Sequence, residues 1–208
     1  MSENKCSVCN KEYKIDYFKF VDPTFDASAS YVIEFCKEKI ARNNTLEWEA
    51  LIHASLATEE MFYWMKEAHC NQVNIGCESG SNDILTRDIR KGLNVSILKR
   101  VFKWAKNHKI ERRAFFILGM PNETRKDIEL TEKLIDDIKP DVVGFTILCP
   151  YPGTSFYDYR TMDDYNWAST DEYDNDYWET DHFSNNELKA ERDRLVNKYK
   201  QNICEAQK

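Results

Sequence analysis

Polar residues and glycines follow five short β-rich segments of this sequence, and these are the residues best placed to do chemistry. Asp22 follows the first segment, His53 the second, Glu78 the third, Gly119 the fourth and Cys149 the fifth. Carboxylates accept hydrogen bonds from hydroxyl or ammonium groups, and glycine lets the backbone approach a ligand closely. One such loop is ordinary turn chemistry. Their recurrence at five successive segment ends predicts a ligand site.

The segments that must position these residues alternate between strand and helix patterns. Runs rich in Val, Ile, Phe, Tyr and Trp predict strands at residues 17–21, 46–52, 72–77, 113–118 and 142–148. Amphipathic runs predict helices at residues 28–42, 59–69, 95–107 and 125–138. One strand and one helix recur about every thirty residues, which is typical of parallel βα units. The alternation leaves an open doubly wound sheet and a barrel equally possible.

Parallel pairing of the strands by itself predicts at which edge of the sheet a ligand binds. In parallel α/β folds, ligands bind at the carboxyl ends of the strands. All five polar loops follow the carboxyl ends of predicted strands. We therefore expect them to meet along one edge of the sheet.

The character of the sequence changes near residue 160. Residues 163–181 are dense in Asp, Glu, Tyr and Trp, and an amphipathic helix is predicted from residue 187 to about 204. Ser184 and Glu187 fit a capping box at its start. We expect residues 1–160 to form the βα domain and residues 161–208 to form an extension packed on it. The acidic run at residues 171–176 lacks the glycine and glutamate of a calcium loop, so it is interpreted as a solvated excursion.

Composition limits the partners and the compartment. The chain has 208 residues and a net charge of -7, which disfavours nonspecific binding to nucleic acid or anionic lipid. No apolar run approaches the roughly 20 residues that span a bilayer, so a cytoplasmic protein is expected. The chain has seven cysteines: Cys6, Cys9, Cys36, Cys70, Cys77, Cys149 and Cys204. In the reducing cytoplasm, most of them are expected to be free thiols.

Three runs of residues carry a resemblance to a known family. They are residues 65–81, which include Gly76-Cys-Glu78-Ser-Gly, then residues 115–124 with Phe115-Phe-Ile-Leu-Gly119, and Pro150-Tyr-Pro-Gly-Thr154. These runs resemble the radical S-adenosylmethionine (SAM) enzymes, most closely the branch often fused to a cobalamin-binding domain. The resemblance implies an incomplete TIM-like (βα)6 barrel with parallel strands and a C-terminal helical extension. It also implies that SAM lies across the strand ends.

The resemblance implies SAM contacts at the first three strand ends. Asp22 occupies the position that contacts the SAM amino group, and Glu78 and Ser79 occupy the ribose contact. Lys91 occupies a position where some relatives place a cation near the SAM carboxylate. His53 stands where the family usually has an arginine, and its charge near neutral pH is open.

The same resemblance implies adenine contacts at the fourth strand end and raises a difficulty with the cluster. Ile117, Gly119 and Glu123 surround the adenine position, the glutamate through the loop structure. The family holds a [4Fe-4S] cluster with three cysteines spaced Cys-x-x-x-Cys-x-x-Cys, and this spacing is absent from the sequence. Cys6 and Cys9 lie in a segment that is interpreted as the helix before residue 17. We therefore expect the cluster ligands to lie outside this chain.

Three hypotheses about function remain open. The first is a segment of an enzyme that cleaves SAM reductively to a 5′-deoxyadenosyl radical, or that transfers a methyl group through cobalamin. The second is a noncatalytic barrel remnant that binds a nucleotide-like ligand. The third is a zinc-dependent or purely structural interaction module. Zinc at Cys6 and Cys9 would need a second ligand pair, which is missing. The substrate is a small molecule of unknown identity, and no metal ligand or catalytic residue is assigned.

Self-association is a further expectation. A chain that begins one βα unit after the cluster loop leaves a strand edge and apolar surface to be covered. The sequence therefore predicts dimerisation or aggregation through the open barrel edge.

Overall fold

The computed structural model describes residues 15–158, 171–173 and 175–202 of the chain. Cys6, Cys9 and Cys204, about which the sequence made predictions, lie outside these residues, as does much of the acidic segment. No helix within the described part is both long enough and apolar enough to cross a membrane.

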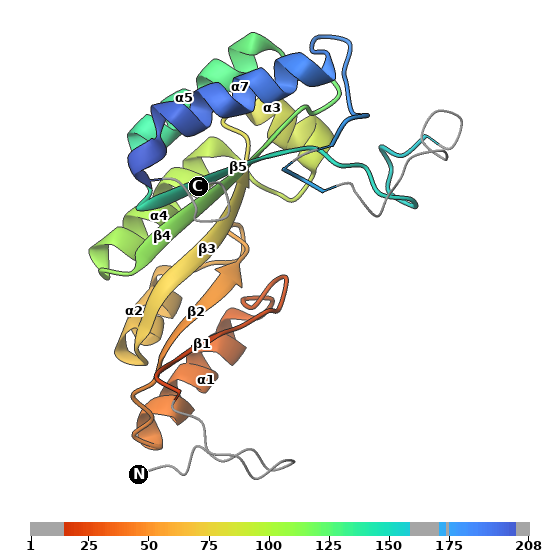
Figure 1. Ribbon diagram of the computed structural model, residues 1–208. Coiled ribbons are helices and arrows are strands. Elements are labelled where there is room, and N and C mark those ends of the chain that lie inside the picture. Colours follow the sequence, from red (N-terminus) through yellow and green to blue (C-terminus); the bar gives the residue numbers. More distant parts are fainter. Residues whose placement is uncertain (1–14, 159–170, 174, 203–208) are drawn as a thin grey trace.

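Five parallel strands form one sheet in the order β1-β2-β3-β4-β5, and the sheet curls into a half-barrel (Figure 1). Every strand pairs with its neighbour in the sequence, whereas a doubly wound sheet reverses its order at a switch point. The barrel expectation is therefore confirmed. The strands are β1 (Tyr17–Lys19), β2 (Glu47–Ile52), β3 (Cys70–Glu78), β4 (Glu111–Leu118) and β5 (Val142–Ile147).

Helices connect the strands and cover the outer face of the sheet, opposite its concave face (Figure 1). A short helix and a π-helical turn between β3 and α4 were not foreseen from the sequence. The elements are α1 (Ala29–Ala41), α2 (Glu59–Glu67), α3 (Asn82–Ile84), the π-helical turn η1 (Leu85–Ile89), α4 (Val95–Asn107), α5 (Arg125–Ile138), α7 (Asn185–Lys198) and the 3₁₀ turn η3 (Lys200–Asn202).

Side-chain caps explain where the helices begin. Ser28, Thr58 and Asn94 each accept a hydrogen bond from a first-turn amide of the following helix. Capping boxes are present at Thr124, with Asp127, and at Ser184, where the sequence predicted one. These contacts satisfy amides that have no partner within the helix itself.

Some boundaries differ from the sequence predictions. β1 was predicted to extend to residue 21 but ends at Lys19; the Phe20 amide still donates to the Glu49 carbonyl of β2, whereas Val21 is 86% exposed. His69 was predicted to be helical, but its positive φ of 66° ends α2 and lets β3 start at Cys70. The final helix ends at Lys198, short of the predicted residue 204.

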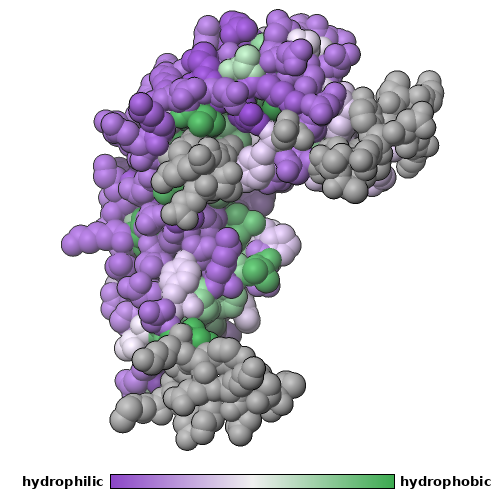
Figure 2. Space-filling view, in the orientation of Figure 1, coloured by the Kyte–Doolittle hydropathy of each residue, from purple (hydrophilic) through white to green (hydrophobic). Residues whose placement is uncertain are grey.

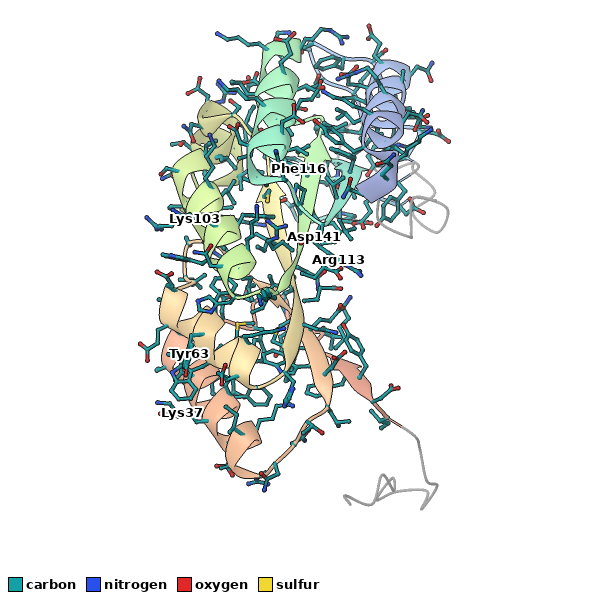
Figure 3. All side chains as sticks on the ribbon, turned by 90° about the vertical axis from the view of Figure 1, so that its left-hand side faces the viewer. Lys37, Tyr63, Lys103, Arg113, Phe116 and Asp141 are labelled. Atoms are coloured by element: carbon teal, nitrogen blue, oxygen red, sulfur yellow. The ribbon has the colours of Figure 1, made fainter. Side chains whose placement is uncertain are left out.

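The core lies between the sheet and its helices. Side chains alternate along β4, so that Phe116 faces the helices and Arg113 points to the opposite side (Figure 3). An aromatic cluster closes the β1 end of this core. The ring centroids of Phe20 and Phe35 lie 5.5 and 5.4 Å from that of Trp48. The outer helical surfaces at the top of the molecule are hydrophilic (Figure 2).

The C-terminal extension packs on the half-barrel. Arg194 and Lys198 of α7 both pair with Glu132 of α5, and the Tyr199 ring lies 6.1 Å from Phe145 of β5. The acidic run at residues 171–176 was interpreted as a solvated excursion. That holds for the exposed Asp171 and Asp176, whereas Asn175 within the run is completely buried. Beyond the run, three aromatic side chains are buried in the core: Tyr177, Trp178 and Phe183.

Candidate functional site

A cavity of about 360 Å³ opens at the carboxyl ends of β2 and β3. The turn after β1 forms one wall. Eight residues line the cavity: Pro23, Thr24, Leu51, Ile52, His53, Gly76, Glu78 and Lys91. Three of these, His53, Glu78 and Lys91, were predicted as site residues, so the fold brings them together.

Glu78 is held by the backbone geometry at the end of β3. The β3–β4 register shifts between Gly76 and Glu78, and Glu78 adopts a positive φ of 64°. This conformation is strained for a residue with a side chain and is common at functional sites. It folds the carboxylate back over Gly76, where an added Cβ would lie 2.6 Å from Glu78 Oε1. Gly76 therefore makes room for this carboxylate.

Lys91 reaches Glu78 from the loop before α4. Its Nζ lies 2.7 Å from Glu78 Oε1, and the lysine side chain is 51% exposed while that of Glu78 is 8% exposed. The pair therefore presents a buried carboxylate and a movable ammonium to the same cavity. These groups match ribose hydroxyls and a ligand carboxylate respectively.

His53 is the third predicted residue in the cavity. Burial and the charge of Lys91 lower the pKa of His53 below its usual value, although the nearby Glu78 carboxylate opposes the shift. The imidazole is therefore neutral near pH 7. Its Nδ1 lies 2.8 Å from Ser55 Oγ, and a hydrogen bond donated by this hydroxyl would leave Nε2 as a donor.

Asp26 was missed by the sequence analysis. Its side chain is completely buried, and its Oδ1 accepts a hydrogen bond of 2.7 Å from the His53 backbone amide. Its Oδ2 has no partner within the described part of the chain, and burial raises the pKa of Asp26 to about 6. Asp26 thus ties the turn after β1 to the end of β2. The sequence offered only a weak signal for Asp26. It follows the buried Phe25, and it lies in the loop where Asp22 had already been chosen as the candidate residue.

Asp22 and Ser79 lie at the strand ends but not in the cavity wall. Asp22 is exposed, directly before the lining residue Pro23. Ser79 is buried, and its hydroxyl contacts Thr131 of α5 at 3.4 Å and accepts a hydrogen bond from the Ser81 amide. Their predicted SAM contacts stay predictions, and the observed role of Ser79 is to fasten this loop to α5.

The three residues predicted around adenine lie at the end of β4, the strand next to β3. Ile117 is half-buried and alternates with the helix-facing Phe116, so it faces the concave side. Gly119 adopts a positive φ of 85°, and its amide donates a hydrogen bond of 2.6 Å to Glu123 Oε2. Trp178 Nε1 donates to the Gly119 carbonyl at 2.7 Å. The loop is therefore held by the side chain of its own Glu123 and by Trp178 of the C-terminal extension.

Glu123 is an unusual carboxyl group. It is completely buried, its Oε1 has no described partner, and burial raises its pKa to about 8, with the Asp127 charge adding to the shift. Its side chain bonds the loop backbone, so it shapes the strand end. Its place around the adenine, through the loop structure, stays a prediction.

The donor set fits SAM better than it fits an iron–sulfur cluster. A carboxylate, an ammonium and a neutral imidazole share one cavity beside parallel strand ends, which suits an adenosyl ligand with an amino acid tail. In contrast, the described residues contain no group of three His, Cys, Asp or Glu side chains able to hold a metal ion. Cys36, Cys70 and Cys77 are free and buried, and burial raises the pKa of each thiol. No step through a cluster can be assigned to these residues.

Sequence comparison gives one family and several relatives. The sequence pattern of the Radical SAM superfamily matches residues 8–135. An uncharacterized methyltransferase of Pyrococcus horikoshii is 32% identical over 153 residues, which are 74% of this chain and 33% of the relative. The anaerobic magnesium-protoporphyrin IX monomethyl ester cyclase of Rubrivivax gelatinosus is 25% identical over 156 residues, or 74% of this chain and 28% of the relative. The chain thus spans about a third of these relatives or less.

Structural comparison supports the fold. The radical S-adenosylmethionine methyltransferase TsrM of Kitasatospora setae, solved with cobalamin and a [4Fe-4S] cluster, superposes with a TM-score of 0.59 at 18% identity. The superposition covers 64% of this chain and 26% of that protein. At this identity the likeness establishes the half-barrel architecture alone.

Proposed function

Because this chain belongs to the radical SAM superfamily, we propose that the cavity at the ends of β2 and β3 binds the adenosyl part of SAM. The observation that carries the proposal is Glu78, a buried carboxylate held at a strained backbone position beside Lys91. In this superfamily, SAM bound beside an iron–sulfur cluster supplies a 5′-deoxyadenosyl radical or a methyl group. The chain's own share is to bind and orient that cofactor.

Each cavity residue has a distinct task in this proposal. Glu78 accepts hydrogen bonds from the ribose hydroxyls, and Lys91 can leave Glu78 to pair with the ligand carboxylate because its side chain is half exposed. His53 is neutral and offers one hydrogen bond without adding charge. Asp26 keeps the turn after β1 closed against the end of β2.

Membership of the family specifies neither the substrate nor the use of cobalamin. The relatives include methyltransferases and a cyclase, which are different reactions on a shared fold. We propose that the whole protein performs SAM-dependent radical chemistry or methyl transfer, with cobalamin as a second cofactor in the methyl-transfer case. Support for the cobalamin part comes from a cobalamin-bound structural relative.

Binding of S-adenosylhomocysteine by calorimetry tests the adenosyl site. We expect Glu78→Gln to weaken binding by about tenfold or more, because a hydrogen bond to a charged group is worth about 1.5–3 kcal/mol. Glu67→Gln is the matched control, since Glu67 is exposed at the end of α2 that precedes the start of β3. Equal affinities of the two variants would refute the assignment of Glu78.

Iron–sulfide reconstitution under anaerobic conditions tests the cluster prediction. We expect this chain alone to form no stable cluster and to cleave no SAM, because its described residues offer no three-ligand set. Robust cleavage by the isolated chain would show that this expectation is wrong. Stoichiometric zinc in the purified protein would instead favour the interaction-module hypothesis.

A further inference from the structure

A row of polar side chains lines the concave face directly below the cavity. Side chains alternate along a strand, so Asn74 lies on the same face of β3 as the cavity residues Gly76 and Glu78. In the sheet register, Asn74 lies between Leu51 of β2, which also lines the cavity, and Arg113 of β4. The polar row is therefore continuous with the cavity wall.

In the lower part of this row, farther from the cavity, the polar side chains hydrogen-bond or form ion pairs with one another. Gln72 Nε2 donates to Glu49 and also to Asn74 Oδ1 at 3.3 Å, while Lys19 pairs with Glu49 at 3.1 Å. Burial opposes the ionisation of Glu49, but hydrogen bonds from Tyr17 and Lys19 and the charges of Lys19 and Arg113 outweigh it and lower the pKa of Glu49. Glu49 is thus an ionised carboxylate with its own partners.

In the upper part of the row, next to the cavity, one buried hydrogen-bond donor has no partner among the described residues. Asn74 is 4% exposed, and its Nδ2 has no hydrogen-bond partner in the described residues. Because Gln72 donates to Asn74 Oδ1, the amide orientation is assigned and its two N–H groups point away from Gln72. A buried donor without an acceptor costs free energy and calls for an explanation.

Arg113 supplies a second donor beside this amide. Neighbouring strands lie about 4.8 Å apart, and Asn74 pairs with Arg113 in register. The Arg113 side chain points to the side of the sheet away from the helices (Figure 3). Its Nε donates to Glu111 at 3.2 Å, a partner whose side chain is 43% exposed and solvated. Its charge also acts on the Glu49 carboxylate. The two terminal NH2 groups of Arg113 can therefore donate to a new partner beside these carboxylates.

We propose that Asn74 and Arg113 bind a carboxylate group of the substrate. An amide N–H pair beside a planar guanidinium fork presents only donors, which matches the two oxygens of a carboxylate. A neutral carbonyl would use Asn74 but would gain little from Arg113. The inference rests on the proposed function, since it takes the cavity above as the adenosyl site. Asn74 lies two residues before Gly76, over which the Glu78 carboxylate folds, so the bound carboxylate lies about 7 Å along the strand from the ribose contact.

Titration with propionate, followed by NMR of the isotope-labelled full chain, tests the site. We expect propionate to shift the Asn74 side-chain amide and Arg113 Nε signals together in a saturable way, and uncharged propionamide to leave Arg113 unchanged. Arg113→Gln should weaken propionate binding by about tenfold, the loss of one charge-assisted contact. Lys103→Gln removes the same charge from the outer face of α4 (Figure 3) and should have no effect.

A second variant separates recognition from structure. Asn74→Leu replaces the amide, whose Nδ2 has no described partner, by an apolar side chain of similar shape, and Gln72 keeps its hydrogen bond to Glu49. We therefore expect an unchanged or higher melting temperature together with lost propionate binding. A lower melting temperature with intact propionate binding would show that Asn74 serves the fold. An equal response to propionate and propionamide would mean that the site does not recognise carboxylates, and equal affinities of Arg113→Gln and Lys103→Gln would overturn the role of Arg113.

S-adenosylhomocysteine binding, measured on the same variants, separates the two proposals. If it binds equally to wild type and Arg113→Gln while propionate binds to neither, only the carboxylate site is wrong. If propionate binds as expected and S-adenosylhomocysteine binds with no dependence on Glu78, the adenosyl site is wrong.

Discussion

Two buried carboxyl groups hold the loops around the site through backbone amides. Asp26 accepts from the His53 amide, and Glu123 accepts from the Gly119 amide. Both have one oxygen without a described partner, and burial raises the pKa of both. The protonation of these residues is therefore coupled to the stability of the fold.

Glu123→Gln should change how stability depends on pH. The pKa of Glu123 rises from 4.5 to about 8 on folding, so the folded state holds this proton more tightly than the unfolded state does. The stability contribution is complete below pH 4.5 and is lost as the pH rises through about 8. Urea unfolding should show that wild type loses up to about 1.4 kcal/mol per pH unit in this window relative to Glu123→Gln. Parallel curves for the two proteins would contradict the raised pKa.

At the scale of elements, close contacts at the strand ends depend on glycine. The Gly80 amide donates to Thr131 Oγ1 at 2.8 Å, and an added Cβ would lie 2.5 Å from the Thr131 Cα. Ser79 meets the same threonine. The loop after β3 and helix α5 therefore touch backbone to backbone, which fixes the end of β3 relative to β4.

Gly80→Ala tests this contact. We expect a loss of about 3 kcal/mol or more in the free energy of unfolding, because the methyl group meets backbone atoms that cannot move aside. Gly153→Ala is the control, since that position has a positive φ and open space, and should cost about 1–2 kcal/mol. Chemical denaturation of both variants measures the difference. A cost for Gly80→Ala no larger than that of the control would show that the loop shifts freely.

At the scale of the whole molecule, the sheet has two ends that a closed barrel would not have. At one end, the Ile147 amide of β5 donates to the Glu172 carbonyl of the C-terminal extension. At the other end, β1 pairs only with β2 among the described strands. We propose that the chain self-associates through the β1 edge, because an unpaired strand edge is a template for another strand.

Light scattering at increasing protein concentration tests this proposal. The Phe20 amide donates toward β2, so by alternation the Lys19 amide points outward. Lys19→Pro should shift the association to at least about tenfold higher concentration, since proline removes that donor. Lys19→Met removes the charge but keeps the amide, and should associate like wild type or more strongly. Monomeric wild type at high concentration would refute the proposal.

The sequence by itself determined the strand and helix types, the parallel pairing and the polar strand ends. These follow from local patterns, because hydrophobic period and capping residues act within a few residues of one another. His53, Glu78 and Lys91 were predicted as one site, and they share one cavity. The curled order of the sheet was left open by the alternation of elements and was expected only from a family resemblance.

Tertiary structure alone decided which side chains meet across the sheet. Asp26 meets the His53 amide, and Trp178 meets Gly119 from 59 residues away. Asn74 lies beside Arg113 only because β3 and β4 pair in one register. Such contacts leave no local pattern, since burial and strand register are set by packing of the whole chain.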